Sequence, residues 1–130
     1  MNIWSRILLH LRRARLRQRF AQQQEGLRET FRSQLLAGTT QNRRWHDIEW
    51  LTEPILHVQP DVDQVPVALV GIAAMYSLDE GNEETPVVQT QAGTALFYFQ
   101  DNTWQSNGKV LLNLTPSEAL TQLNLKGLVY

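Results

Sequence analysis

The sequence predicts an α+β fold in which a long N-terminal helix packs on an antiparallel sheet of three to five strands, followed by a short C-terminal helix. Residues 3–37 contain no proline and are rich in good helix formers. From residue 45 the apolar pattern shifts to the two-residue period of strands, and a helix-capping sequence follows at 115–123. Because helices and strands do not alternate along the chain, the pattern argues against a parallel α/β sheet.

The predicted N-terminal helix carries apolar side chains on two opposite faces. Asn2 can cap its start and Gly38 its end, while Gly26 either divides it into two helices or weakens one. At about 100° per residue, steps of seven and four place one group on a single face: Leu9, Leu16, Phe20, Leu27, Phe31 and Leu35. A second group projects from the other side near the N-terminus: Trp4, Ile7, Leu8 and Leu11. One domain face cannot bury both groups, so we expect another surface to cover the second.

The middle of the chain has the composition of strands and turns. Residues 38–44 resemble a polar linker, and the first strand is expected from Trp45. In this strand one set of side chains, His46, Ile48 and Trp50, alternates with another, Trp45, Asp47, Glu49 and Leu51. PILHVQP extends it as an edge or a bend, because it is bounded by Pro54 and Pro60. Further segments predict a turn at 60–66, a central strand at 65–78, an acidic loop at 79–86 and an antiparallel hairpin formed by 87–99 and 103–114 around QDN.

The C-terminal helix has the clearest local signal. Thr115 can serve as N-cap, Pro116 as the first helical residue and Glu118 as the partner in a capping box, which predicts a helix from about 116 to 123. A long helix on such a sheet resembles the cystatin-like or NTF2-like arrangement. TALFYFQDNTWQSNGKVLLNLTPSEAL and RRWHDIEW, together with the basic helix, resemble small uncharacterised bacterial proteins of this layout. That resemblance implies no activity, cofactor or functional residue.

The length and composition fit a single domain over residues 1–130, with a basic helix or helix pair at 1–37 and the sheet at 45–130. The chain has no cysteine, which removes disulfides, thiolate zinc sites and cysteine nucleophiles. No targeting segment is convincing, and no apolar run reaches the roughly 18 residues of a membrane span. We therefore expect a cytoplasmic protein, with peripheral attachment to a membrane as an alternative.

The charge is divided unevenly along the chain. Residues 1–44 carry ten arginines against two acids, a balance of +8, whereas residues 45–130 carry two lysines against eleven acids, a balance of −9. The division suggests a basic arm on an acidic body. Alternatively, the two halves neutralise one another within one molecule or between copies.

These observations favour a non-enzymatic interaction protein whose N-terminal helix mediates assembly, with a protein partner such as a second copy of the chain. The expected contact residues are Ile3, Trp4, Ile7, Leu8, Leu11, Arg12, Arg13, Arg15, Arg17 and Arg19. An anionic membrane surface or a nucleic acid is the alternative partner, because guanidinium groups suit phosphates.

A small pocket of the NTF2-like type, with an enzymatic or ligand-binding role, is a further alternative. Its polar groups would come from the first strands: His46, Asp47, Glu49, His57 and Tyr76. The sequence contains no nucleophile motif, no glycine-rich phosphate loop and no metal-binding pattern, so we predict no catalytic residue, no metal site and no cofactor.

Overall fold

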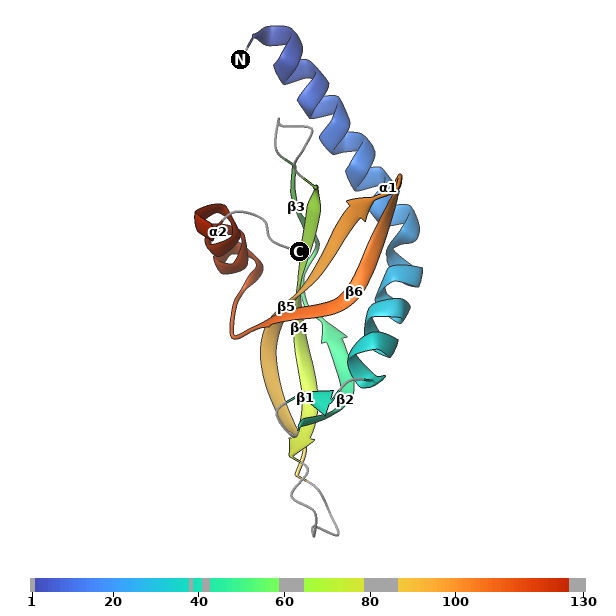
Figure 1. Ribbon diagram of the computed structural model, residues 1–130, viewed down its shortest axis with the longest axis vertical. Helices are drawn as coiled ribbons and strands as arrows, with labels where there is room; N and C mark the ends of the chain where they lie inside the picture. Colours follow the sequence, from blue (N-terminus) through green and yellow to red (C-terminus); the bar gives the residue numbers. More distant parts are fainter. Residues whose placement is uncertain (1, 38, 41–42, 59–64, 79–86, 127–130) are drawn as a thin grey trace.

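A computed structural model describes residues 2–37, 39–40, 43–58, 65–78 and 87–126 of the chain. The elements in chain order are α1 (Ile3–Ala37), β1 (Thr39–Thr40), β2 (Arg43–Trp50), β3 (Ile55–His57), β4 (Val67–Leu78), β5 (Gln89–Gln100), β6 (Thr103–Leu112) and α2 (Pro116–Lys126). Figure 1 shows α1 running along one side of a curled antiparallel sheet, with α2 on the other side. This architecture confirms the predicted α+β class.

α1 is one continuous helix of 35 residues, so Gly26 does not divide it in two. Its start is capped as predicted, because Asn2 Oδ1 accepts a hydrogen bond of 2.8 Å from the backbone N–H of Ser5. The predicted apolar stripe is buried, with Leu9 partly buried beside it: Leu16, Phe20, Leu27, Phe31 and Leu35. The spacing by seven and four therefore identified the face of α1 that packs on the sheet.

The described residues form a six-stranded sheet in which all pairs are antiparallel, and five of the strands follow the order β1-β2-β4-β5-β6. β3 stands off this path and pairs with residues 67–69 of β4, whereas β2 pairs with residues 72–78 of the same strand. β2 and β3 therefore lie on the same side of β4, with a break around Pro54, and β1 pairs with the outer side of β2. The break follows the prediction of an edge or a bend at Pro54. β4 is covered on both faces, because Val70 and Ile72 belong to the cluster under α1, while Val67 and Leu69 belong to the cluster on the side of α2. This coverage accounts for its nearly continuous apolar sequence.

The larger apolar cluster lies between α1 and the sheet, and aromatic rings form its centre. The Phe20 ring lies 5.5 Å from that of Phe97 and 5.2 Å from that of Trp104, both in edge-to-face arrangements. Trp104 Nε1 also donates a hydrogen bond of 3.0 Å to the carbonyl of Leu16. These contacts join the middle of α1 to β5 and β6 and determine where the helix sits on the sheet.

A smaller cluster lies on the opposite side of the sheet, where Ala119 of α2 packs against β4 and β5. The predicted capping box is present at the start of α2. The backbone N–H of Glu118 donates to Thr115 Oγ1 at 3.2 Å, and Glu118 Oε1 accepts from the backbone N–H of Thr115 at 3.0 Å. α2 continues to Lys126, beyond the predicted end at 123.

Two predictions about β2 were wrong. β2 begins at Arg43 and pairs with β1, so the segment expected as a linker contains strand pairing. A register shift between Trp45 and Asp47 places His46 in a β-bulge. Because a bulge adds one residue to the strand, it interrupts the two-residue period. Trp45 and Ile48 are both buried as a result, while His46 is exposed. The predicted alternation, with His46 and Ile48 in one set and Trp45 in the other, is therefore wrong.

The β5–β6 hairpin confirms the predicted turn, since Asp101 and Asn102 both adopt positive φ angles between the paired residues Gln100 and Thr103. β5 begins at Gln89, two residues later than the apolar pattern suggested. The acidic loop at 79–86, residues 60–64 of the expected turn and the Gly38 cap lie outside the described residues.

Candidate docking site

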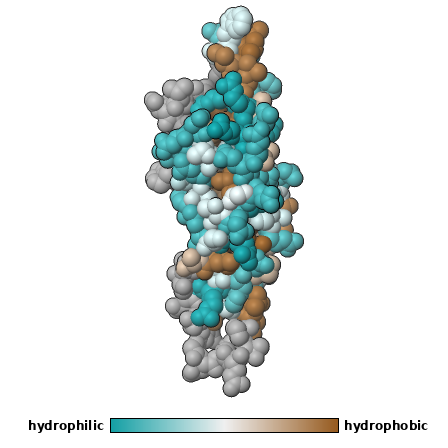
Figure 2. Space-filling model, turned by 90° about the vertical axis from the view of Figure 1, so that its right-hand side faces the viewer, coloured by the Kyte–Doolittle hydropathy of each residue, from teal (hydrophilic) through white to brown (hydrophobic). Residues whose placement is uncertain are grey.

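The first turns of α1 extend beyond the sheet and carry a group of exposed apolar side chains (Figures 1 and 2). We call this group the apolar tip, and it consists of Ile3, Trp4, Ile7, Leu8 and Leu11. The exposed fraction of these side chains ranges from 44% at Ile7 to 70% at Ile3 and Trp4. Single exposed apolar residues are ordinary on protein surfaces, whereas a contiguous group of five is the feature that makes this end of α1 a candidate site.

The apolar tip lies on the side of α1 that is turned away from the sheet. At 100° per residue its positions span an arc of about 140°, almost opposite the buried Leu16 and Phe20. The prediction that the two apolar groups project from opposite sides is confirmed by their burial and exposure. The tip remains helical because the packed part of α1 supplies the nucleus from which the helix extends.

Two of the arginines predicted for docking bind the body of the same molecule. Arg13 Nη2 donates to the carbonyl of Val58 at 3.2 Å, next to the end of β3. Arg19 Nη2 donates to the carbonyl of Asn102 at 2.9 Å, in the β5–β6 turn. These two arginines therefore join α1 to the end of β3 and to the β5–β6 turn, a role that the sequence does not predict.

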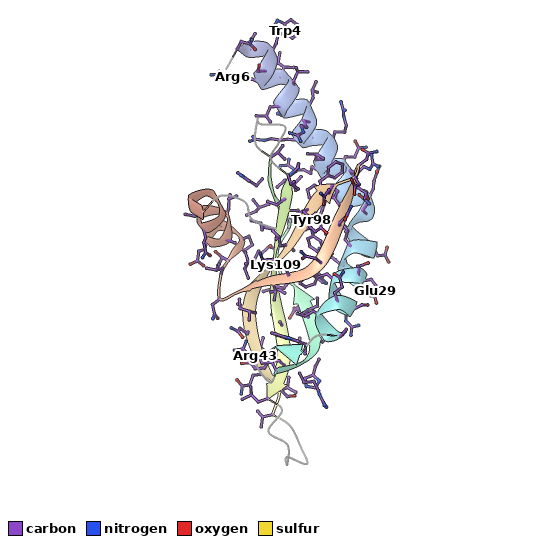
Figure 3. The ribbon with its side chains drawn as sticks, in the orientation of Figure 1. Trp4, Arg6, Glu29, Arg43, Tyr98 and Lys109 are labelled. Carbon is purple, nitrogen blue, oxygen red and sulfur yellow. The ribbon has the colours of Figure 1, made fainter. Side chains whose placement is uncertain are left out.

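Other arginines around the apolar tip project into solvent. Arg15 and Arg17 are exposed, and nothing among the described residues forms a hydrogen bond or ion pair with their guanidinium groups. Arg6 is also exposed, although it was not among the predicted contact residues. Its helical angle, beside the arc of the apolar tip, indicates that it belongs with them. Figure 3 shows Arg6 and Trp4 pointing in different directions from the first turn. Arg12 is partly buried and makes a contact of its own.

His57, at the end of β3, interacts electrostatically with the guanidinium group of Arg13. Partial burial of the ring and the positive charge of Arg13 both lower the pKa of His57 from its usual value of 6.5. The protonated form of His57 is thus disfavoured in the folded protein, at the place where α1 contacts β3.

We expect the protein to lose stability as the pH falls below about 6.5. A lowered pKa in the folded state means that the unfolded chain binds the His57 proton more tightly, so stability rises with pH. The contribution of neutral His57 to the free energy of unfolding is fully present above the pKa of His57 in the unfolded chain, about 6.5. It is lost as the pH falls from there through the lower pKa of the folded protein. Urea titrations at about pH 8 and about pH 5 measure it. His57→Gln should show a smaller loss than the unmodified protein, and an equal loss would contradict the prediction.

The residues predicted for a pocket are spread over the sheet. His46 is exposed in the bulge of β2, with its Nε2 2.7 Å from Ser77 Oγ. Asp47 is also exposed, and its Oδ1 accepts a hydrogen bond of 3.0 Å from Arg32 Nε of α1. This bond is the main reason that the pKa of Asp47 is lowered. Glu49 is exposed further along the same strand.

The remaining two pocket residues lie apart from one another on the β4 ladder. Tyr76 is buried beneath Arg43, whose guanidinium carbon lies 4.7 Å from the centre of the Tyr76 ring. The Tyr76 hydroxyl donates a hydrogen bond of 3.2 Å to Gln89 Oε1. His57 pairs with Val67, roughly 30 Å along β4 from Tyr76. The five residues do not converge on one cavity. Among the described residues, no group of three or more His, Asp or Glu side chains could hold a metal ion.

A shallow groove of about 390 Å³ follows the middle of α1 beside Trp50, at residues that the sequence analysis did not select. Arg28 lies over the Trp50 ring at 5.1 Å from its centre. The groove is also lined by Glu25, Glu29 and Arg32, so its charges are of both signs. Such mixed charge at three- and four-residue spacing is typical of a solvated helix face.

No protein-family model, no curated protein and no solved structure matches the chain. The resemblance to small bacterial proteins therefore stays a prediction. Among the described residues, no helix combines the length and the apolar character needed to cross a membrane.

Proposed function

We propose that this chain is a non-enzymatic docking protein, in which a folded α+β body carries a projecting basic helix that attaches it to another surface. The observation that supports the proposal is the apolar tip, whose five large side chains are between 44% and 70% exposed. Leaving such side chains in water is unfavourable by about 1.5–3 kcal/mol for each one that a partner would bury completely. A surface that covers the tip therefore gains a large apolar contribution to binding.

The way in which the body is built supports the same role. The buried stripe of α1 and the hydrogen bonds from Arg13 and Arg19 hold the helix on the sheet from Arg13 onward. The tip is thus presented on a continuous helix rather than on a loop, which lowers the conformational entropy lost on binding. A cytoplasmic location and assembly with a second copy or another partner belong to this proposal.

The test compares the unmodified protein with Trp4→Ser/Leu8→Ser, in which two exposed side chains of the apolar tip become polar. Two arms measure docking: light scattering on the purified protein for self-association, and flotation with lipid vesicles for surface attachment. We expect docking in at least one arm, weakened about 100-fold by the double substitution. Both residues are exposed, so circular dichroism should show an unchanged fold.

Val87→Ser/Val88→Ser is the matched control. Val87 and Val88 are 67% and 54% exposed, similar to the substituted tip residues, but they precede β5 and lie outside the tip. The control should dock like the unmodified protein. The proposal is wrong if the unmodified protein shows no docking in either arm, or if the tip and control variants dock equally well.

A further inference from the structure

Resting on the proposed function, we infer that the surface to which the apolar tip docks is an anionic lipid membrane, on which the first turns of α1 lie. A membrane-surface helix combines an apolar face with basic side chains along its borders, so that the apolar groups enter the acyl boundary while the cations remain among the headgroups.

The arginines of α1 occupy both borders of the apolar arc. At 100° per residue, Arg15 lies just inside the edge of the arc that Leu8 forms and Arg12 lies beyond that edge, while Arg6 and Arg17 lie beyond the opposite edge at Ile3. Arg6, Arg15 and Arg17 are exposed, and the sequence places no acidic residue before Glu25. A helix of this design is attracted to phosphate headgroups from both edges at once. Trp4 supplies the aromatic ring that favours the membrane interface.

The shape of the molecule gives a flat surface access to the tip. Figure 1 shows that the sheet lies on one side of α1 and that the first turns of the helix extend beyond the end of the sheet. The helical angles and the exposure of the tip place its side chains on the opposite side. Further along that outward side, Glu25 and Glu29 lie beside Arg28 and Arg32, so the positive charge is no longer unopposed. Figure 3 shows Glu29 pointing away from the sheet. Glu25 follows Leu11 by roughly 20 Å along the helix. The carboxylates offset the charge of these arginines, so the N-terminal end of α1, which has no acidic residue, should be the part that contacts an anionic membrane.

A symmetric pairing of two tips is less favourable than a lipid surface. Pairing two tips would bring the arginines of both helices together with no acidic residue from either N-terminal segment, residues 1–24, to neutralise them. The tip is also small, since a helix segment about 12 Å long offers roughly a few hundred Å² on one side. A stable protein interface buries about 800 Å² on each partner. Insertion into a lipid surface has no such requirement.

The experiment measures the partition of the full chain onto vesicles of phosphatidylcholine, with and without phosphatidylglycerol, at low and high salt. We expect binding to the anionic vesicles, weak binding to the neutral ones, and a loss of binding as salt screens the arginines. Arg15→Gln/Arg17→Gln should lower the partition coefficient about 30-fold, because each basic residue near an anionic membrane contributes about fivefold. The emission maximum of tryptophan fluorescence, to which Trp4 contributes, should shift to shorter wavelength on binding.

Arg44→Gln/Lys109→Gln is the matched control, because it removes the same amount of charge from exposed positions away from the tip. It should change the partition coefficient less than twofold. Equal binding to neutral and anionic vesicles, or equal losses in the two charge variants, would overturn the inference. So would tip-dependent self-association without vesicle binding, although that result would leave the proposed docking function intact. Preferential capture of a duplex oligonucleotide, lost in Arg15→Gln/Arg17→Gln, would likewise assign the arginines to nucleic acid.

Discussion

Replacing Phe20 with alanine should lower the free energy of unfolding by about 3–5 kcal/mol. The Phe20 side chain is 1% exposed, and its ring meets those of Phe97 and Trp104 edge to face. The substitution removes these contacts and leaves a cavity between the middle of α1 and the sheet, where close packing permits little collapse. Urea unfolding followed by circular dichroism measures the change.

Gln22→Ala is the control for this substitution. Gln22 is exposed two residues further along the same helix, so its replacement should alter the free energy of unfolding by less than about 0.5 kcal/mol. A loss of less than about 1 kcal/mol in Phe20→Ala would show that α1 is not held by this aromatic cluster, and the placement of the helix on the sheet would then be wrong.

Gly108→Ala should lower the free energy of unfolding by about 2 kcal/mol, through the backbone and through packing together. Gly108 lies in the irregular part of β6 between Ser106 and Val110, where the register with β5 shifts, and its φ angle is +78°. A side chain is strained in this conformation. A Cβ at this position would also lie 2.9 Å from Gln34 Cβ of α1, a contact that requires the helix or strand to move.

The same substitution at Gly26 provides a control of opposite sign. Nothing lies within 4 Å of a Cβ at Gly26, which occupies the exposed interior of α1. Alanine favours the helix there by about 0.5–1 kcal/mol, so Gly26→Ala should raise the free energy of unfolding. Denaturation midpoints that move in the same direction for both variants would contradict the positions of the two glycines.

The candidate site was partly predictable because a helix has a regular period. The apolar tip and the buried stripe were both assigned from the sequence, since 100° per residue places them on opposite sides whatever the rest of the chain does. The pocket residues were not predictable in this way. His46, His57 and Tyr76 belong to three different strands, and their separation depends on the bulge in β2 and on which end of β4 each strand pairs with.

The sequence alone determined the elements whose signals are local: the continuous apolar face of α1, the capping box at Thr115 and the turn at Asp101. Each depends on residues within a few positions of one another, and backbone geometry fixes their relation. Only the tertiary structure decided which arginines remain available for a partner. Arg13 and Arg19 bond to carbonyls 45 and 83 residues away, whereas Arg15 and Arg17 project into solvent. All four are alike as residues of a helix, and they differ only because folding places a backbone acceptor beside two of them.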